Sequence, residues 1–172
     1  LGLIGIGKIG TEEAKRAKGF DMKILFFSGT RKVELEESLN LIWTNSLDDL
    51  LKQSDFISLH VPLTKETKYI ISKKELDKMK PTAILINTSR GPVVNQKDLY
   101  EALKEKKISA AGLDVLEIEP IPLSDSILSL DNVVLTPHLG TATHKTRAIM
   151  AKMALENLLA GLSNKKLPFP VN

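Results

Sequence analysis

The sequence predicts an α/β fold built on a doubly wound parallel sheet in a single domain. The first observation is that short aliphatic runs alternate with helical patterns almost from end to end of the 172 residues, which implies βαβ units. The second is that runs such as 83–86 are aliphatic throughout instead of alternating with polar residues. Strands of that kind are typical of a parallel sheet with helices on both faces.

In the first part of the chain, three strands and two helices are expected. A strand at 1–4 leads through a glycine turn into a polar-rich helix at 8–18. The next strands are expected at 23–27 and 41–43, where apolar residues follow one another. Ser46 then begins a helix that runs to 51, because its hydroxyl can accept a hydrogen bond from a free backbone N–H of the first turn.

The middle of the chain continues the pattern with clearer helix starts. A strand at 55–60 is followed by a loop that contains a proline. Ser72 and Glu75 have the spacing of a capping box and predict a helix start. After a strand at 83–86, Asn95 is expected to cap a helix that runs to about 107.

The last third is expected to hold two strands and one long helix. The strands are predicted at 110–115 and 133–136, with a proline-bearing loop at 117–131 between them. A long helix follows at about 143–162, and residues 167–170 carry two prolines that exclude a helical end. We expect residues 1–162 to form one domain and residues 163–172 to be a tail.

The composition is that of an ordinary globular protein and excludes several classes. With 42% hydrophobic and 26% charged residues, disorder and fibrous repeats are excluded. The excess of 24 Lys and Arg over 21 Asp and Glu comes from lysines scattered among acids, so we interpret it as solvated helix faces and expect no nucleic-acid partner. No apolar run approaches the roughly 18 residues of a membrane helix, and we expect a cytoplasmic protein with no membrane partner. The absence of cysteine excludes disulfides and thiolate sites, and we expect no metal.

A glycine-rich motif stands directly after the first predicted strand. Gly5, Gly7 and Gly10 form a GxGxxG that opens the first predicted helix, which is the context that a dinucleotide-binding motif requires. The first glycine allows the tight turn, the second lets a pyrophosphate approach the backbone, and the third lets helix and strand pack closely. The helix N-terminus then attracts the phosphates. The motif makes the predicted sheet one of the Rossmann type.

The end of the second strand indicates which dinucleotide binds. An NAD site places Asp or Glu about 20 residues after the glycines, where the carboxylate accepts from the ribose 2′-OH. Here Ser28 stands at that place, followed by Thr30, Arg31 and Lys32. A carboxylate would repel a 2′-phosphate, whereas a hydroxyl beside two cations attracts it. We therefore expect NADP(H) to be preferred with NAD(H) possible, unless Arg31 and Lys32 are only a solvated loop.

Polar residues at the ends of three later strands supply a candidate catalytic set. They lie in Asn87–Gly91, in Gly112–Pro120 and in Thr136–Thr141, and open α/β sheets bind ligands at that edge. With the segments LGLIGIGKIG, SDFISLHVPLTKET, INTSRGPVVNQKDLYEAL, AAGLDVLEIEP and LTPHLGTATHKTR, the chain resembles the D-isomer-specific 2-hydroxyacid dehydrogenases over its whole length. Ser28 and the stretch GTATHKTR favour the branch of the family that reduces glyoxylate and hydroxypyruvate.

The resemblance implies Arg90, Glu119 and His138 as catalytic residues. Reduction of a 2-keto acid needs a hydride and a proton on the carbonyl oxygen, and an imidazole such as that of His138 is suited to donate the proton. Glu119, which directly precedes a proline, would orient that imidazole and favour its protonated form. Glu117 is the residue most easily mistaken for it. Arg90 would bind the substrate carboxylate and polarise the carbonyl.

The family pattern implies further contacts to cofactor and substrate. Thr141 would join Arg90 and His138 at the substrate. The cofactor contacts implied beyond the glycines and the 28–32 segment are Lys8, Ile9, Pro62, Thr88, Asp114 and Gly140.

The resemblance also implies that this chain is one domain of a two-domain enzyme. Residue 1 is Leu and already lies inside an aliphatic run, so we expect the polypeptide to begin upstream, with a substrate domain toward which the tail returns. The expected partners are a small 2-keto or 2-hydroxy acid and a second copy in a homodimer. Two alternatives remain: another dehydrogenase of the family, of the phosphoglycerate or D-lactate type, and a non-catalytic NAD-sensing transcriptional corepressor.

Overall fold

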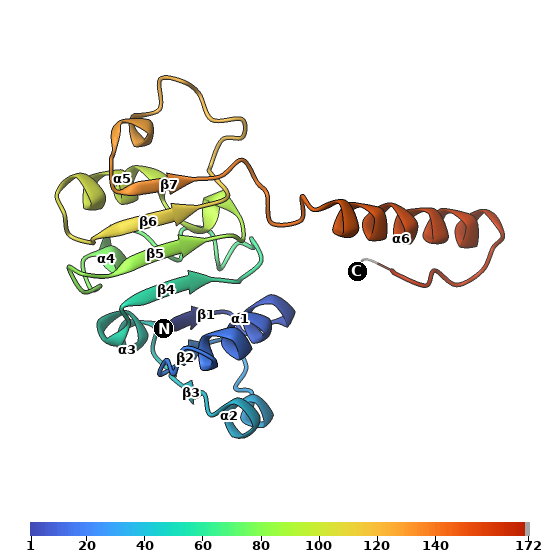
Figure 1. Cartoon of the computed structure of the whole chain (residues 1–172), viewed down its shortest axis with the longest axis horizontal. Helices are drawn as coiled ribbons and strands as arrows, with labels where there is room; N and C mark the ends of the chain where they lie inside the picture. Colours follow the sequence, from blue (N-terminus) through green and yellow to red (C-terminus); the bar gives the residue numbers. More distant parts are fainter. Residues whose placement is uncertain (171–172) are drawn as a thin grey trace. The chain divides into compact units, whose positions relative to one another are not determined.

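The computed structural model describes residues 1–170 and confirms the predicted α/β class. It divides into two compact units, the first covering Leu1–Pro137 and the second beginning at His138. The first unit holds a sheet of seven strands, all parallel, in the order β3-β2-β1-β4-β5-β6-β7 (Figure 1). The strands are β1 (Gly2–Ile4), β2 (Leu25–Phe27), β3 (Ile42–Trp43), β4 (Phe56–Leu59), β5 (Ile84–Asn87), β6 (Ala110–Leu113) and β7 (Val133–Leu135).

The strand order reverses beside β1, which pairs with β2 on one side and with β4 on the other. The connections that leave the carboxyl ends of β1 and β4 therefore run to opposite faces of the sheet, and ligands bind in the crevice between such connections in open parallel sheets. All of the segments with predicted site residues in the first unit follow strands of this sheet.

Three of the described helices begin where the sequence places a cap. The helices are α1 (Lys8–Lys18), α2 (Val33–Leu39), α3 (Leu47–Gln53), α4 (Lys73–Leu76), α5 (Gln96–Lys104) and α6 (His144–Leu162), with 3₁₀ turns η1 (Gly91–Val93) and η2 (Ser126–Ser129). Ser46 accepts from Asp49 N at 3.3 Å and Asn95 from Asp98 N at 3.1 Å, while Ser72 begins α4 with a capping box. The sequence analysis did not predict α2, whose first turn carries two glutamates that favour a helix N-terminus.

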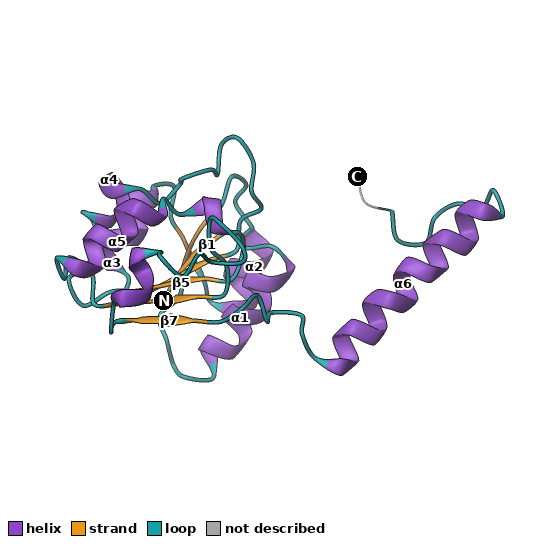
Figure 2. Cartoon of the chain, turned by 90° about the horizontal axis from the view of Figure 1, so that it is seen from above, coloured by secondary structure: helices purple, strands orange, loops and turns teal. Residues whose placement is uncertain are grey.

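Two apolar clusters hold the sheet between its helices, which lie on both of its sides (Figure 2). The larger cluster joins the sheet to α3, α4 and α5 through residues such as Leu51, Leu76 and Leu99, all at most 1% exposed. The smaller one joins β1 and β2 to α1 through Leu3, Phe26 and Ala14. The smaller cluster does not extend over β5, β6 and β7.

The side of β5–β7 that lies beyond the smaller cluster is open. Ser58, Ile86, Gly112 and Val134 stand in register across four strands and face the same way. Along this row Ser58 is 1% exposed, whereas Val134 is 69% exposed and a Cβ at Gly112 would meet no atom within 4 Å. Within the first unit, the helices therefore cover this face over β1 and β2 and leave it open over β5–β7.

The second unit consists of a turn, α6 and a returning segment. Thr143 caps α6 by accepting from Thr146 N at 3.1 Å. Asn157 on α6 holds the segment through two hydrogen bonds to the backbone of Phe169, and residues 167–170 are not helical, as their prolines predict. Within the described residues no helix, α6 included, has the length and apolar character needed to cross a membrane.

Candidate active site

The glycine loop between β1 and α1 has no room for side chains at two of its three glycines. Gly5 has a φ of +93°, and a Cβ there would lie 2.8 Å from the backbone of His60. A Cβ on Gly10 would lie 2.6 Å from the carbonyl oxygen of Gly5, whereas one on Gly7 would meet nothing within 4 Å. Gly7 is thus open on its outer side, directly before the first free N–H groups of α1. This geometry forms a cradle for a phosphate group.

A partly buried polar cluster lies beneath the loop. The His60 side chain is 4% exposed, and its Nε2 lies 2.5 Å from Glu13 Oε2 and 3.0 Å from Ser58 Oγ. Ser58 also donates to Glu13 at 2.9 Å. Burial alone would raise the pKa of Glu13, but the hydrogen bond and charge of His60, with the bond from Ser58, lower it below its ordinary value. The cluster ties α1 to β4. The sequence analysis missed it because Glu13 and His60 are 47 residues apart in the chain.

After the end of β2, one of the two cations predicted to attract a phosphate, Arg31, is already paired with a carboxylate. Arg31 forms a bidentate pair with Glu36, at 2.8 and 2.9 Å, and its guanidinium lies 5.1 Å from the centre of the Trp43 ring. Glu36 raises the pKa of Arg31 through this pair. Ser28 donates to the carbonyl of Thr30 at 2.6 Å, which folds the segment into a tight turn.

A pocket of about 460 Å³ opens between the loops that follow β1, β4 and β5. It gathers four residues that the sequence analysis assigned to cofactor or substrate: Ile9, Pro62, Thr88 and Arg90. Asn87, which is 1% exposed, organises this edge by accepting from Ser89 and donating to the Arg90 carbonyl at 3.0 Å. Sequence analysis assigned no role to Asn87.

The Arg90 loop packs directly against the loop that carries Glu119. A Cβ at Gly91 would lie 1.9 Å from the Leu116 carbonyl oxygen, so the two backbones touch. Glu119 Oε1 accepts from Leu116 N at 3.0 Å. Glu117 instead accepts from Gln96 N at 2.7 Å, at the start of α5. The two glutamates therefore have different environments, and Glu117 is engaged by the helix.

The remaining predicted residues fall in two places. Asp114, which is 8% exposed, accepts from Thr136 at 2.5 Å at the ends of β6 and β7. His138, Gly140 and Thr141 belong to the turn of the second unit that precedes α6. His138 has a φ of +55°, a left-handed conformation that is uncommon for a residue with a side chain and that recurs at functional sites.

Comparison with known proteins gives consistent matches. Residues 1–140 match the family model described as D-isomer specific 2-hydroxyacid dehydrogenase, NAD binding domain. The glyoxylate reductase of Thermococcus litoralis is 54% identical over 172 residues, which are all of this chain and 51% of that protein. Among solved structures, the NADPH-dependent glyoxylate/hydroxypyruvate reductase of Sinorhizobium meliloti, in complex with NADP and malonate, aligns with a TM-score of 0.91 at 33% identity, covering 99% of this chain and 52% of that one.

A D-lactate dehydrogenase from Lactobacillus jensenii, solved with NAD+, aligns with a TM-score of 0.87 at 33% identity, covering 99% of this chain and 55% of that one. The chain thus spans about half the length of the relatives that it matches.

Proposed function

The chain belongs to the D-isomer-specific 2-hydroxyacid dehydrogenases, and on this premise we propose that it is the cofactor-binding half of an NADP(H)-dependent reductase of glyoxylate- and hydroxypyruvate-type 2-keto acids. In this proposal residues 1–162 form the dinucleotide-binding domain, and the tail at 163–172, whose last two residues lie outside the described part, returns toward a substrate domain. The observation that carries the proposal is the pocket that places Arg90 and Thr88 beside the glycine loop.

The residues around the loop fit a dinucleotide. Gly7 leaves open the space that a pyrophosphate would fill, and the N–H groups that begin α1 at Lys8 and Ile9 would donate to it. Pro62 and Thr88 line the pocket that continues from the loop and would flank the two ribose halves. Asp114 would meet the nicotinamide carboxamide, and Gly140 would lie at the nicotinamide edge. When bound, the cofactor supplies a hydride to the substrate carbon.

The end of β2 supports a preference for NADP(H). Ser28 stands where an NAD-type site has a carboxylate, and Thr30, Arg31 and Lys32 follow it in the chain with hydrogen-bond donors and positive charge that a 2′-phosphate would attract. The NADP complex of the Sinorhizobium meliloti reductase is consistent with this reading. The Glu36 pair leaves one terminal nitrogen of Arg31, Nη1, outside the bidentate contact, and that nitrogen would meet the phosphate.

The protein side chains would act on the substrate as follows. Arg90 would hold the substrate carboxylate with its planar guanidinium. His138 would donate a proton to the carbonyl oxygen as negative charge develops there, with Glu119 orienting the imidazole. Thr141 would line the same substrate edge. These roles rest on the family pattern and on the chemistry of the side chains.

The proposal is tested with the parent polypeptide and purified 2-keto acids. NADPH oxidation is followed with glyoxylate, hydroxypyruvate, pyruvate and phosphohydroxypyruvate, and each is repeated with NADH. We expect turnover of glyoxylate and hydroxypyruvate above the other two acids and a higher kcat/KM with NADPH. A preference for pyruvate or phosphohydroxypyruvate would select another dehydrogenase of the family, a preference for NADH would overturn the cofactor assignment, and no turnover of any 2-keto acid would favour a corepressor.

We propose also that the parent protein is a homodimer, as the family resemblance implies, that it is cytoplasmic, and that it has no nucleic-acid partner, because its lysines are scattered among acids. Light scattering during size-exclusion chromatography measures the subunit number directly. Cell fractionation locates the protein, and a mobility shift with duplex DNA tests the last point.

A further inference from the structure

The two loops that carry Arg90 and Glu119 are in backbone contact, so the position of one limits the position of the other. Arg90 lies directly before η1, and the Gly91 Cα faces the Leu116 carbonyl so closely that a Cβ would lie 2.0 Å from the carbonyl carbon. Glu119 reaches back to accept from Leu116 N at 3.0 Å. Both loops therefore contact the Leu116–Glu117 peptide, so a shift of this peptide would move Arg90 and Glu119 relative to each other.

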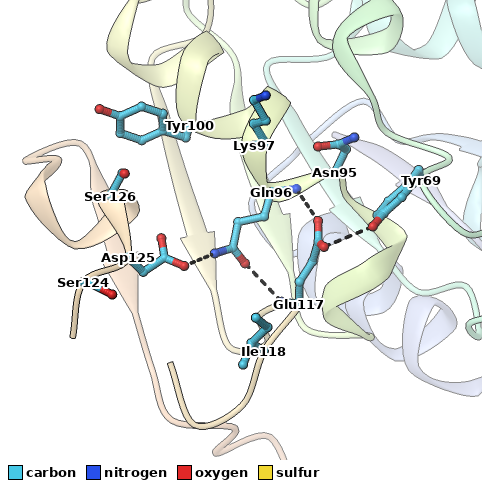
Figure 3. A pocket seen from close by; sticks show the side chains of 10 residues that line it. All are labelled: Tyr69, Asn95, Gln96, Lys97, Tyr100, Glu117, Ile118, Ser124, Asp125 and Ser126. Atoms are coloured by element: carbon cyan, nitrogen blue, oxygen red, sulfur yellow. Dashed lines mark hydrogen bonds between the residues drawn. The ribbon is translucent and has the colours of Figure 1, made fainter. Parts of the chain in front are cut away.

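That peptide is held in place by three side chains, Gln96, Glu117 and Tyr69, which we call the loop clamp (Figure 3). Gln96 N donates to Glu117 Oε1 at 2.7 Å, and Glu117 N donates back to Gln96 Oε1 at 3.0 Å. This reciprocal pair joins the start of α5 to the loop after β6. Tyr69 adds a third bond, from its hydroxyl to Glu117 Oε2 at 3.1 Å.

The clamp is itself anchored on both sides. Gln96 Nε2 donates to Asp125 at 2.8 Å, and Asp125 in turn caps η2 by accepting from Ile127 N at 3.0 Å. On the other side, Tyr69 N donates to the Pro92 carbonyl at 2.9 Å, in the turn that follows Arg90. Glu117 raises the pKa of Tyr69, as expected for a hydroxyl that donates to a carboxylate. Every group of the clamp thus has a defined partner on a different loop.

From this geometry we propose that Gln96, Glu117 and Tyr69 are positioning residues, which hold the Glu119 loop at a fixed place against the Arg90 loop. In this proposal they act through Glu119 and make no contact of their own with substrate or cofactor. The inference rests on the proposed function, because Glu119 has a catalytic partner only in a dehydrogenase. It also gives Glu117 a role of its own: both carboxylate oxygens are used inside the clamp, so this residue stabilises the loop and does not orient the catalytic imidazole.

The test is a double-mutant cycle in the parent polypeptide. Glu117→Ala is expected to lower kcat by about tenfold or more, because the Glu119 loop loses the hydrogen bonds that hold it against the Arg90 loop, while KM for the nucleotide stays unchanged. In a Glu119→Gln background the same substitution is expected to have almost no further effect on kcat. Non-additivity of this kind identifies residues that act through one another.

Two further variants separate positioning from a structural role. Glu117→Gln keeps an oxygen for Gln96 N and is expected to restore most of kcat. Lys97→Ala, which changes the residue next to Gln96 on α5, is the matched control and is expected to leave kcat unchanged. Equal effects of Glu117→Ala in both backgrounds, or a loss of kcat with Lys97→Ala, would overturn the inference.

Hydrogen exchange tests the loop clamp without an activity assay, and exchange in β4 and β5 shows whether the variant has a general folding defect. Glu117→Ala is expected to speed amide exchange in residues 115–119 and to leave β4 and β5 unchanged. Unchanged exchange in 115–119 overturns the inference while the proposed function stands. No turnover of any 2-keto acid by the unaltered protein overturns the proposed function, and with it the catalytic part of the inference.

Discussion

Replacement of Gly91 by Ala is the sharpest test of the contact between the two loops. The added Cβ would lie 1.9 Å from the Leu116 carbonyl oxygen and 2.6 Å from Glu117 N. Real Cβ atoms essentially never approach closer than 3.0 Å, so the loops must separate by at least 3.0 − 1.9 = 1.1 Å. The obstructing atoms belong to the backbone, and no side chain can rotate away to relieve the clash.

The cost of this separation follows from overpacking in other proteins. Insertion of a methyl group into a packed region typically lowers the free energy of unfolding by about 1–3 kcal/mol. Because the Gly91→Ala methyl group would clash with rigid backbone atoms, we expect a loss at the upper end, about 3 kcal/mol. For a protein of this size, each kcal/mol lowers Tm by about 2–4 °C, so the expected loss is about 6–12 °C by differential scanning calorimetry.

Gly112→Ala is the matched control. Its Cβ would meet nothing within 4 Å, and Ala is preferred over Gly in a strand by about 0.5–1 kcal/mol, so Tm should stay the same or rise slightly. A Gly91→Ala variant as stable as the unaltered protein, or a Gly112→Ala variant that loses as much, would refute the loop contact.

Three other outcomes are expected. His138→Ala should lower kcat in the parent polypeptide by at least about a hundredfold, the usual contribution of a general acid, with nucleotide binding intact; a lost affinity for NADPH by fluorescence titration would show that the assigned role is wrong. Ser28→Asp should weaken NADPH binding by about tenfold or more and spare NADH, since like charges 4 Å apart repel by about 1 kcal/mol in water and more when partly desolvated; equal losses for both nucleotides would contradict the assignment. The pKa of Glu13 is lower in the folded protein than its ordinary 4.5, so its stabilising effect is complete above that pH and is lost as the pH falls through the folded value. Tm should therefore fall in acid less steeply for Glu13→Gln, and identical pH profiles would count against this.

The features that the sequence predicted correctly are those with short-range signals. The caps at Ser46 and Asn95 depend on residues three positions apart, and the glycine loop depends on six consecutive residues that follow a strand. The parallel sheet followed from the aliphatic character of each strand, which needs no knowledge of its neighbours. Such signals report local hydrogen bonding and burial, which the same few residues determine.

The features that sequence reasoning missed depend on contacts between distant residues. Glu13 reads as an ordinary surface residue of a helix until His60 lies beside it, and Gln96 reads as the first exposed position of α5 until Glu117 pairs with it. Arg31 was assigned to a phosphate without its partner Glu36, because the helix that carries Glu36 was not predicted. No single-sequence pattern specifies a pairing of polar side chains across 21 or 47 residues.

The left-handed backbone at His138 gives that position two separate requirements. The turn needs a residue that tolerates a φ of +55°, and the proposed chemistry needs an imidazole. Ala meets neither requirement, because a methyl side chain in that conformation costs on the order of 1 kcal/mol, whereas Asn adopts it readily and lacks the titrating ring. His138→Asn would thus remove the titrating ring and keep the turn. The difference in free energy of unfolding between the Asn and Ala variants would measure what the left-handed conformation of the turn requires of its side chain.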